Sequence, residues 1–326
     1  MTPASGLAIV GRMWRGSAET ALWVVTTYFN PAGYAARRHN HQRFCAALGA
    51  VPCLTIECAE RDRTFELAPG PNVVQVRAAD TLWHKERLIN LALCRLPPSC
   101  RFVAWVDGDV LFENPDWQKH AMELLGDKCA VQLFSDVALM PSPLAAQHDE
   151  KPQVVDGFAA KTSRDPESLR AGRFDAHGHT GFAWAMRRDV LSEVGLYDAC
   201  IVGSADHVMA HALLDGPFAT CVTRLLGLGT PHHRHFVAWA DRLRASIGQR
   251  RLAGIGAVPG RILHLWHGSI ADRRYFDRNQ RLLRLGFDPR VDLLDEPGQP
   301  WRLRDPGGEL AAFLRDYFAQ RNEDSL

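Results

Sequence analysis

The sequence predicts an α/β fold in which a doubly wound, mostly parallel central sheet is flanked by helices. Apolar segments of strand length alternate with segments of helical length along the chain. The run Phe102–Val106 is apolar at every position, which is typical of a strand that is covered on both faces. The chain has 326 residues and no recognisable linker, so we expect one domain with a C-terminal extension.

Turn and capping residues delimit the elements that we expect in the first half of the chain. Asn30-Pro31 ends the first strand, Asp80-Thr81 can cap a helix, and Pro97-Pro98 stops that helix. In chain order we expect an irregular lead-in (1–20), a strand (22–28), a helix (34–48), two strands (51–57 and 73–76), a helix (81–95), a strand (102–106), a helix (116–125) and a strand (130–134).

The second half is less regular. Prolines punctuate a polar stretch at 141–175, where we expect a long loop or lid, and long loops are often functional. Beyond it we expect, in chain order, a strand (181–186), two helices (188–194 and 205–214), a late strand (262–266) and a charged, partly helical tail (275–326).

Charge and cysteine usage narrow the class of protein. There are 38 lysines and arginines against 37 aspartates and glutamates, so the net charge of +1 does not suggest a nucleic-acid partner. None of the eight cysteines forms a C-x-x-C pair, and we expect reduced thiols in a reducing compartment. We recognise no signal peptide and no membrane-spanning stretch, and therefore expect a cytoplasmic protein, with peripheral membrane contact left open.

Two carboxylates follow the apolar strand, in Asp107-Gly108-Asp109. Asp-Gly is also a common turn, but ligands of open α/β sheets bind outside the carboxyl ends of the strands. Paired carboxylates there suit a hard divalent cation that also holds substrate phosphates, and Gly108 lets the backbone approach a ligand. We therefore predict a metal site at Asp107 and Asp109.

Histidines supply further candidate ligands. His264 and His267 flank an apolar pair near the end of the late strand, where one or both can bind a transition metal or pack in the core. For His232-His233-Arg234-His235 we favour an exposed loop or a phosphate contact over a metal site. His177 and His179 precede a strand and can line a substrate cleft.

Four polar residues on the expected elements are candidates for binding or catalysis. Asp206 falls in the first turn of a helix, as a capping acid or as a general base. Lys85 lies on the apolar stripe of its helix, where it either snorkels or reaches a diphosphate. Asn90 lies off that stripe and can bond a donor or a loop, whereas Glu57 ends a strand and suits ribose hydroxyls. The chain has no G-x-G-x-x-G and no P-loop, so dehydrogenase, kinase and ATPase functions lose support.

Four blocks of this sequence, in order, resemble nucleotide-sugar glycosyltransferases of the GT-A fold, of the family-2-like, D-x-D-containing kind. The blocks are the opening strand Val24–Pro31, the K-x(4)-N segment Lys85–Asn90 ahead of Val106–Asp109, the acceptor-side segment Thr180–Leu191 with Gly195–Asp198, and the late histidine-containing strand. The resemblance implies a catalytic domain at 1–275, with a nucleotide-sugar half at about 20–135, an acceptor half at about 136–275, and a C-terminal helical extension at 276–326.

The resemblance also implies roles for individual residues. Asp109 becomes the main carboxylate ligand of the metal, with Asp107 at the ribose or in the metal's coordination sphere and His264 or His267 as the late ligand. Asp206 matches the general base of inverting members, although this chain has Gly203-Ser204-Ala205-Asp206 where the family has paired acids. The residues implied for the nucleotide-sugar are Thr27, Glu57, Lys85, Asn90 and Gly181.

The function that follows from the resemblance is metal-dependent hexosyl transfer. The donor is expected to be a nucleotide-sugar, in the first place a UDP-sugar, the metal Mn²⁺ or Mg²⁺, and the acceptor a hydroxyl of a glycan or of a lipid-linked substrate. A nucleotidyltransferase and a non-catalytic sugar-binding relative are the alternatives. The sequence leaves open which sugar, nucleotide and acceptor are used, while Asp206 favours inversion at the anomeric carbon.

Overall fold

A computed structural model describes residues 21–171, 176–214 and 216–325, and it confirms the predicted α/β class. Its central sheet has seven strands in the order β10-β6-β9-β4-β1-β2-β3. The strands are β1 (Leu22–Phe29), β2 (Cys53–Glu60), β3 (Val73–Ala78), β4 (Phe102–Val106), β6 (Ala130–Gln132), β9 (Ala183–Arg187) and β10 (Ile255–Ala257). Only β9 runs antiparallel to its neighbours, β4 and β6, so the sheet is mostly parallel as expected.

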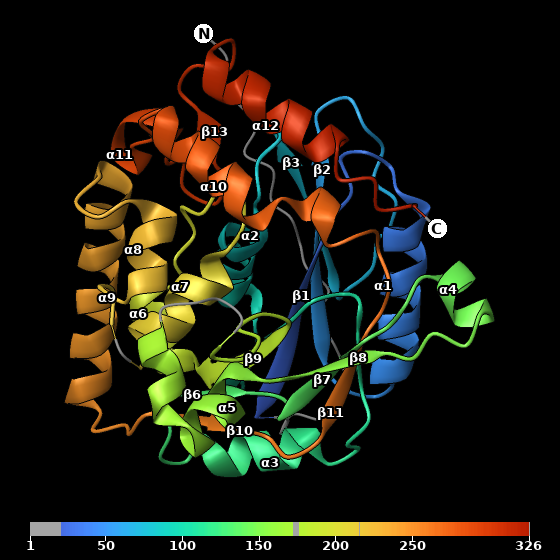
Figure 1. Ribbon diagram of the computed structural model, residues 1–326, viewed down its shortest axis with the longest axis vertical. Helices are drawn as coiled ribbons and strands as arrows, with labels where there is room; N and C mark the ends of the chain where they lie inside the picture. The colour runs from blue at the N-terminus through green and yellow to red at the C-terminus, as the bar shows by residue number, and fades with distance from the viewer. Residues whose placement is uncertain (1–20, 172–175, 215, 326) are drawn as a thin grey trace, which may run out of the picture.

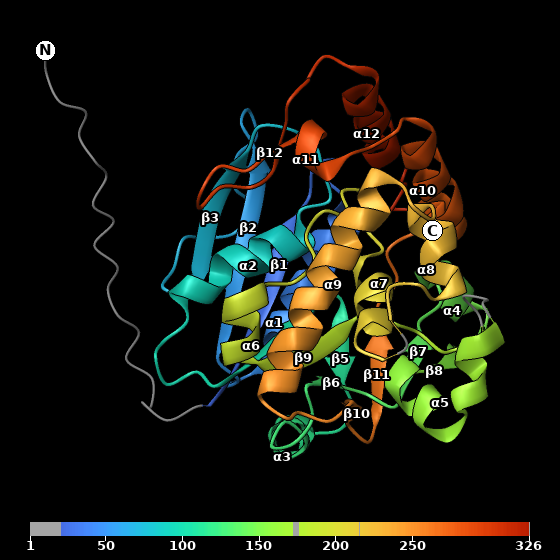
Figure 2. The same cartoon turned by 90° about the vertical axis from the view of Figure 1, so that its left-hand side faces the viewer.

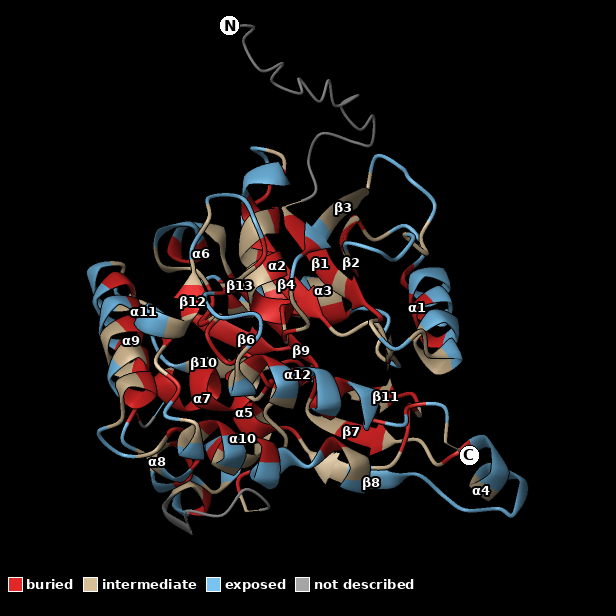
Figure 3. Ribbon diagram, turned by 90° about the horizontal axis from the view of Figure 1, so that it is seen from above, coloured by how far each residue is buried: buried red, intermediate tan, exposed pale blue. Residues whose placement is uncertain are grey.

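Both faces of the central sheet are buried, which explains the apolar runs. In β4, Val103 and Trp105 point into one hydrophobic cluster, while Ala104 and Val106 point into a second cluster on the other face. Every residue of β4 is buried. The prediction that this strand is covered on both faces is therefore confirmed, and Figure 3 shows the buried residues concentrated along the central strands.

Helices cover the two faces of this sheet. One face packs against α2 (Lys85–Ala92), α6 (Arg188–Val194) and α9 (Pro231–Gln249), which lie in front of the central strands in Figure 2. The opposite face packs against α1 (Ala35–Leu48) and α3 (Trp117–Leu124) through Phe44, Trp117 and Ala121. The doubly wound arrangement is thus the one predicted.

A second sheet, of four strands in the order β5-β11-β7-β8, lies beside the second face. Its strands are β5 (Val110–Phe112), β7 (Asp136–Leu139), β8 (Gln153–Asp156) and β11 (Arg261–His264). The late strand of the sequence is β11, and it belongs to this sheet and not to the central one. Its pairing places His264 opposite Val110, directly after the Asp-Gly-Asp turn.

Several helices of the second half depart from the expectations. The stretch at 141–175 is not one loop, because it holds α4 (Pro143–Gln147), β8, α5 (Phe158–Arg164) and a 3-10 helix (Pro166–Ala171). His232–His235 are helical too, since Thr230 caps α9 and Pro231 occupies its first turn, where a missing N–H costs nothing. The remaining helices here are α7 (Ala205–Ala212) and α8 (Thr220–Leu226).

The boundaries of two elements in the first half also differ from those expected. The helix expected from residue 81 begins at Lys85, because Asp80 accepts a hydrogen bond from the backbone of Leu303 and does not cap the helix. The strand β2 continues to Glu60, three residues beyond Glu57. The lead-in at 1–20 lies outside the described residues.

The tail is partly helical, as predicted, and it packs onto the sheet end that holds the Asp-Gly-Asp turn. It contains α10 (Tyr275–Arg284), α11 (Pro289–Asp292), the paired strands β12 (Leu293–Leu294) and β13 (Arg302–Leu303), and α12 (Glu309–Ala319). Figure 1 shows α10 and α12 across one end of the central strands. Phe318 of α12 meets Phe29 of β1 with ring centroids 5.7 Å apart, so the tail shares the main core.

The last residues of the chain hold α1 in place. Both carboxylate oxygens of Asp324 accept hydrogen bonds at the start of α1, from the backbone N–H groups of Ala35 and Ala36 at 2.9 and 2.8 Å. Glu323, which is 1% exposed, pairs with Arg37 of α1 and with Arg321. Two residues near the C-terminus therefore fix the first helix.

We expect Glu323→Ala to lower the free energy of unfolding by about 3–5 kcal/mol, because it leaves two guanidinium groups without their buried partner. Urea unfolding followed by circular dichroism measures this. Glu309→Ala is the control, since Glu309 pairs with Arg281 at the surface, where a pair contributes about 0–1 kcal/mol. Equal losses for the two variants would contradict the role of Glu323.

Candidate functional site

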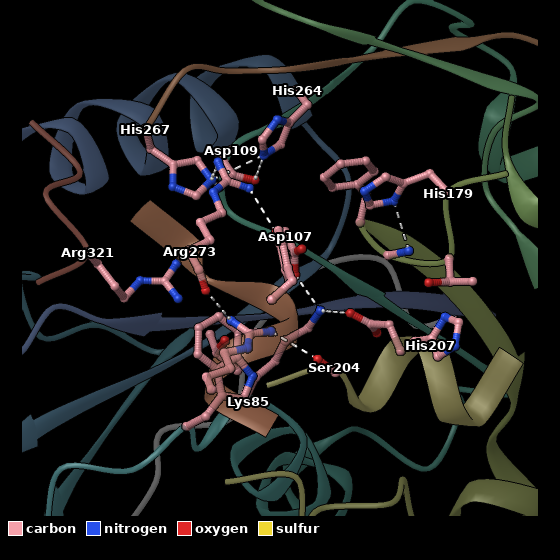
Figure 4. A pocket seen from close by; sticks show the side chains of 18 of the residues that line it. Lys85, Asp107, Asp109, His179, Ser204, His207, His264, His267, Arg273 and Arg321 are labelled. Carbon is pink, nitrogen blue, oxygen red and sulfur yellow. Dashed lines mark hydrogen bonds and ion pairs between the residues drawn. The ribbon is translucent and has the colours of Figure 1, made fainter. Parts of the chain in front are cut away.

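A cavity of about 430 Å³ opens at the carboxyl ends of β1 and β4. Thr27 and Phe29 reach it from β1, the turn Asp107–Asp109 from the end of β4, and Gly181 from the segment before the antiparallel β9. The cavity therefore lies at the edge of the sheet where α/β folds bind ligands. Figure 4 shows its polar side chains pointing toward one another from both sides.

Asp109, His264 and His267 form one side of the cavity, and their ligand atoms lie within 4.8 Å of one another. His267 Nε2 is 3.1 Å from Asp109 Oδ2, and His264 Nε2 is 3.8 Å from Asp109 Oδ1. The two Nε2 atoms are 3.2 Å apart. The sequence could not choose between the two histidines, and the structure brings both to Asp109.

This group fits a divalent cation. Asp109 Oδ1 is buried and has no hydrogen-bond partner among the described residues, although a buried carboxylate oxygen normally has one. Burial lowers the pKa of His264 well below its usual value, so its imidazole is in the neutral, metal-binding form. Burial opposes ionisation of Asp109, but His267 above all, together with Arg273, outweighs it and lowers the pKa of that carboxyl. One carboxylate and two imidazoles leave positions for ligands from a substrate.

The second chemical feature is Lys85, whose ammonium lies between two carboxylates. Lys85 Nζ is 2.6 Å from Asp107 Oδ1 and 2.9 Å from Asp206 Oδ2. Burial disfavours the charged amine, but Asp107, Asp206 and Glu86 outweigh it and hold the pKa of Lys85 well above its usual value. Burial and the neighbouring acids raise the pKa of Asp107 to about 6, with Lys85 opposing them. Lys85 therefore does not snorkel to solvent.

Asp206 reaches the cavity from the first turn of α7, where the helix dipole favours a negative charge. Ser204, two residues before Asp206, has a φ of 76°, which is unfavourable for a residue with a Cβ. Two donors of α10 hold Ser204 Oγ in this conformation, Arg278 at 3.0 Å and Asn279 at 3.3 Å. The tail thus fixes the turn that presents Asp206.

Phe182 is a further strained residue of the cavity wall. Its φ is 80°, and its carbonyl accepts the backbone N–H of Asp107 at 2.8 Å. The ring stacks on His179 with centroids 3.9 Å apart and meets His264 at 4.5 Å. Strained conformations that packing enforces are typical of functional sites. Gly108 completes this wall, since a Cβ there would lie 3.1 Å from His41 Nδ1.

Cations from the tail line the cavity, and no local pattern in the sequence indicated them. Arg273 Nη2 lies 3.0 Å from His267 Nε2 and Nη1 donates to the hydroxyl of Tyr275, and Arg278 and Arg321 line the same cavity. With Lys85 and Arg37, five cations line the cavity against the three carboxylates described above. This excess of positive charge suits an anionic ligand such as a diphosphate.

The structure brings most of the predicted residues together and leaves two out. Thr27, Lys85, Gly181 and the histidines 177, 179, 264 and 267 line the cavity, as do the three aspartates. Asn90 does not, because its amide bonds the backbone of Leu196 and the carboxylate of Asp198. Glu57 does not either, since it accepts hydrogen bonds from the backbone of Glu66 and Leu67 and from Gln75.

The two buried histidines of α9 do not belong to the cavity either. His232 and His233 are buried in the first turn of the helix, and His233 Nε2 lies 3.0 Å from the carbonyl of Pro217. Neither lines the cavity. The phosphate contact that the sequence favoured as one option for this cluster therefore has no support in the cavity described here.

No known family model matches the sequence, and no curated protein matches it either. Among solved structures, the chain is similar to glucosyl-3-phosphoglycerate synthase from Mycobacterium tuberculosis with Mn²⁺, UDP and glucosyl-3-phosphoglycerate, at 12% identity and a TM-score of 0.40, over 89% of this chain and 93% of that one. It is also similar to the catalytic domain of Drosophila β1,4-galactosyltransferase 7 with xylobiose, at 10% identity and a TM-score of 0.34, over 73% and 65% of the two chains. The chemistry of the cavity itself therefore has to indicate the function.

No helix in the described ranges has both the length and the apolar character to cross a bilayer.

Glu86, beside Lys85, gives a pH-dependent test of this electrostatic arrangement. Burial above all raises the pKa of Glu86 to about 8, with Asp206 and Asp107 adding to it and Lys85 opposing it. The unfolded chain loses this proton near pH 4.5, whereas the folded chain keeps it until about pH 8. The free energy of unfolding should therefore fall as the pH rises through this window. We expect Glu86→Gln to raise the melting temperature more at pH 8 than at pH 5, measured by calorimetry, and Glu309→Gln to show no such difference.

Proposed function

We propose that this protein is a metal-dependent glycosyltransferase that moves a sugar from a nucleotide-sugar to an acceptor hydroxyl. The observation that carries the proposal is the placement of Asp109, His264 and His267 beside five cations at the carboxyl end of β4. Such a site suits the diphosphate of a nucleotide-sugar, which is both anionic and a ligand for a divalent cation. A UDP-sugar is the donor that the resemblance implies.

The donor side follows from the same residues. Asp109, His264 and His267 would hold Mn²⁺ or Mg²⁺, with Asp107 close by, and the imidazoles favour Mn²⁺ over Mg²⁺. When bound, the cation neutralises charge that develops on the leaving diphosphate. Arg273 and Arg278 lie where they can contact phosphate oxygens, and Thr27 and Gly181 border the same cavity.

We assign the general base to Asp206. Its Oδ2 is held by Lys85, while Oδ1 is buried without a hydrogen-bond partner in the described part of the chain. In the proposed reaction Oδ1 accepts the proton of the acceptor hydroxyl as that oxygen bonds the anomeric carbon, and the bond from this carbon to the diphosphate breaks. Attack from the face opposite the leaving group inverts the anomeric centre.

For the acceptor we propose only a chemical class. His179 and Thr180 border the cavity on the side of Asp206, so a polar hydroxyl-bearing acceptor fits there. A glycan or a lipid-linked sugar is the class that the resemblance implies.

A donor screen tests the reaction. With a panel of UDP-, GDP- and CMP-sugars, we expect Mn²⁺-dependent release of one nucleoside diphosphate or monophosphate, and its loss on chelation. Asp109→Asn should abolish the release and weaken Mn²⁺ binding in calorimetry, whereas the exposed Asp127→Asn should change neither. Release of pyrophosphate would indicate a nucleotidyltransferase, and binding of glycan without metal-dependent turnover would indicate a sugar-binding protein.

The base assignment has its own test. We expect Asp206→Asn to lower the turnover number by about 10²–10⁴-fold and to leave calorimetric binding of UDP with Mn²⁺ nearly unchanged. Asp198→Asn is the matched control, because it removes a partly buried carboxyl that pairs with Arg87 and does not line the cavity. Wild-type turnover in Asp206→Asn would sink the assignment.

A further inference from the structure

A second group of metal-ligand side chains shares no residue with the group around Asp109, and two of its members, His177 and His207, line the same cavity. It comprises His177, His207, His211 and Cys221, here called the His₃Cys cluster. These side chains are 1%, 7%, 0% and 1% exposed, so all four are more than nine-tenths buried. Three imidazoles and a thiol are an unusual content for a protein core, because buried polar groups need compensating interactions.

The four side chains converge from three segments of the chain. His207 and His211 are four residues apart on α7 and so share one face of the helix. His177 comes from the segment before β9, and Cys221 from the first turn of α8. Each offers one ligand atom, and the four atoms lie within 4.8 Å of one another.

Two distances within the cluster are close to those of a tetrahedral site. His211 Nε2 is 3.4 Å from His177 Nε2 and 3.1 Å from Cys221 Sγ. With zinc–nitrogen bonds of about 2.0–2.1 Å and a zinc–sulfur bond of about 2.3 Å, tetrahedral ligand atoms lie about 3.3–3.6 Å apart. Binding therefore needs adjustments of a few tenths of an ångström at these atoms.

His177 is already oriented for this purpose. Its Nδ1 lies 3.0 Å from the carbonyl oxygen of Gly178, and a carbonyl can only accept, so Nδ1 carries the proton. The Nε2 lone pair of the neutral ring then points into the cluster. Metal-bound histidines commonly donate their other ring N–H to a backbone carbonyl in this way. Gly178 has a φ of 80°, and a Cβ there would lie 2.8 Å from the carbonyl of Asp156, so this turn requires glycine.

We propose that the His₃Cys cluster binds a structural zinc ion. Imidazole and thiolate favour zinc over the hard cations Mg²⁺, Ca²⁺ and Mn²⁺, which prefer oxygen ligands. Four protein ligands close a tetrahedral shell, and such closed sites are structural, whereas catalytic sites keep an open position. This ion is distinct in ligand type from the cation proposed at Asp109.

A zinc ion at this cluster would stabilise the part of the fold around α7. The zinc ion ties α7 to α8 and to the segment that carries Gly178 and His179, which borders the cavity. His207 directly follows Asp206, so the ion fixes the helical turn that presents this carboxylate. The proposal does not depend on sugar transfer, because it concerns the binding of a metal by the folded chain.

Metal analysis of the protein tests the proposal. In an Asp109→Asn/His267→Ala background, which disables the first metal group, protein purified from zinc-supplemented medium should retain about one zinc per chain. Adding Cys221→Ser should reduce this at least tenfold. Cys200→Ser is the matched control, since Cys200 is 2% exposed and lies outside the cluster, and it should leave the zinc content unchanged.

Cobalt substitution gives a second, spectroscopic readout. The metal-stripped protein refilled with Co²⁺ should show the intense visible bands of a tetrahedral centre and a thiolate-to-cobalt charge-transfer band. Added zinc should displace the cobalt and abolish both. Absence of zinc together with octahedral cobalt bands in folded wild-type protein would overturn the proposal and leave the cluster as a buried hydrogen-bond network. Retention of zinc and of the charge-transfer band in Cys221→Ser would overturn the assigned ligand set.

Discussion

The ion pairs of Lys85 are the interaction on which the cavity depends. One ammonium group meets carboxylates from the end of β4 and from the start of α7, so three elements far apart in the sequence are joined at one point. Without this cation, Asp107 and Asp206 would repel each other in a buried setting and one of them would take up a proton. The positions of the metal ligands and of the base are therefore coupled through a single side chain.

Local patterns were enough to predict the parts of the fold that local physics controls. The apolar run of β4 and the Asp-Gly-Asp turn were recognisable because a strand buried on both faces has no polar position until it ends. The sequence did not indicate which sheet the late strand joins, because strand pairing depends on segments 150 residues apart and leaves no trace in periodicity. The exposed loop expected at His232–His235 is helical, since the proline before it, Pro231, can begin either a loop or the first turn of a helix.

Some residues of the candidate site could be recognised in the sequence, and others could not. Asp107, Asp109, Asp206 and Lys85 stood out because charged residues at strand ends or on apolar stripes require a reason. Glu57 stood out because it was expected to end a strand, and Asn90 because it lies off the apolar stripe of its helix, yet each satisfies backbone groups of a neighbouring loop. Arg273 and Arg278 had no local signal in a tail rich in arginine, and Cys221 looked like any core thiol. Only tertiary packing separates structural from functional polar residues of this kind.

The contacts of the C-terminal residues with α1 also bear on how the molecule forms during synthesis. Arg37 and Glu323 are 286 positions apart, and translation at roughly 5–20 residues per second separates their appearance by about 15–60 s. Arg273 and Arg278 follow all the central strands in the sequence, so late in that interval the nascent chain has those strands but neither the arginines that complete the cavity nor the carboxylates that hold its first helix. A ribosome-bound intermediate would therefore expose an unfinished pocket, and ligand affinity would arise only after the segment from Arg273 to Asp324 emerges and docks.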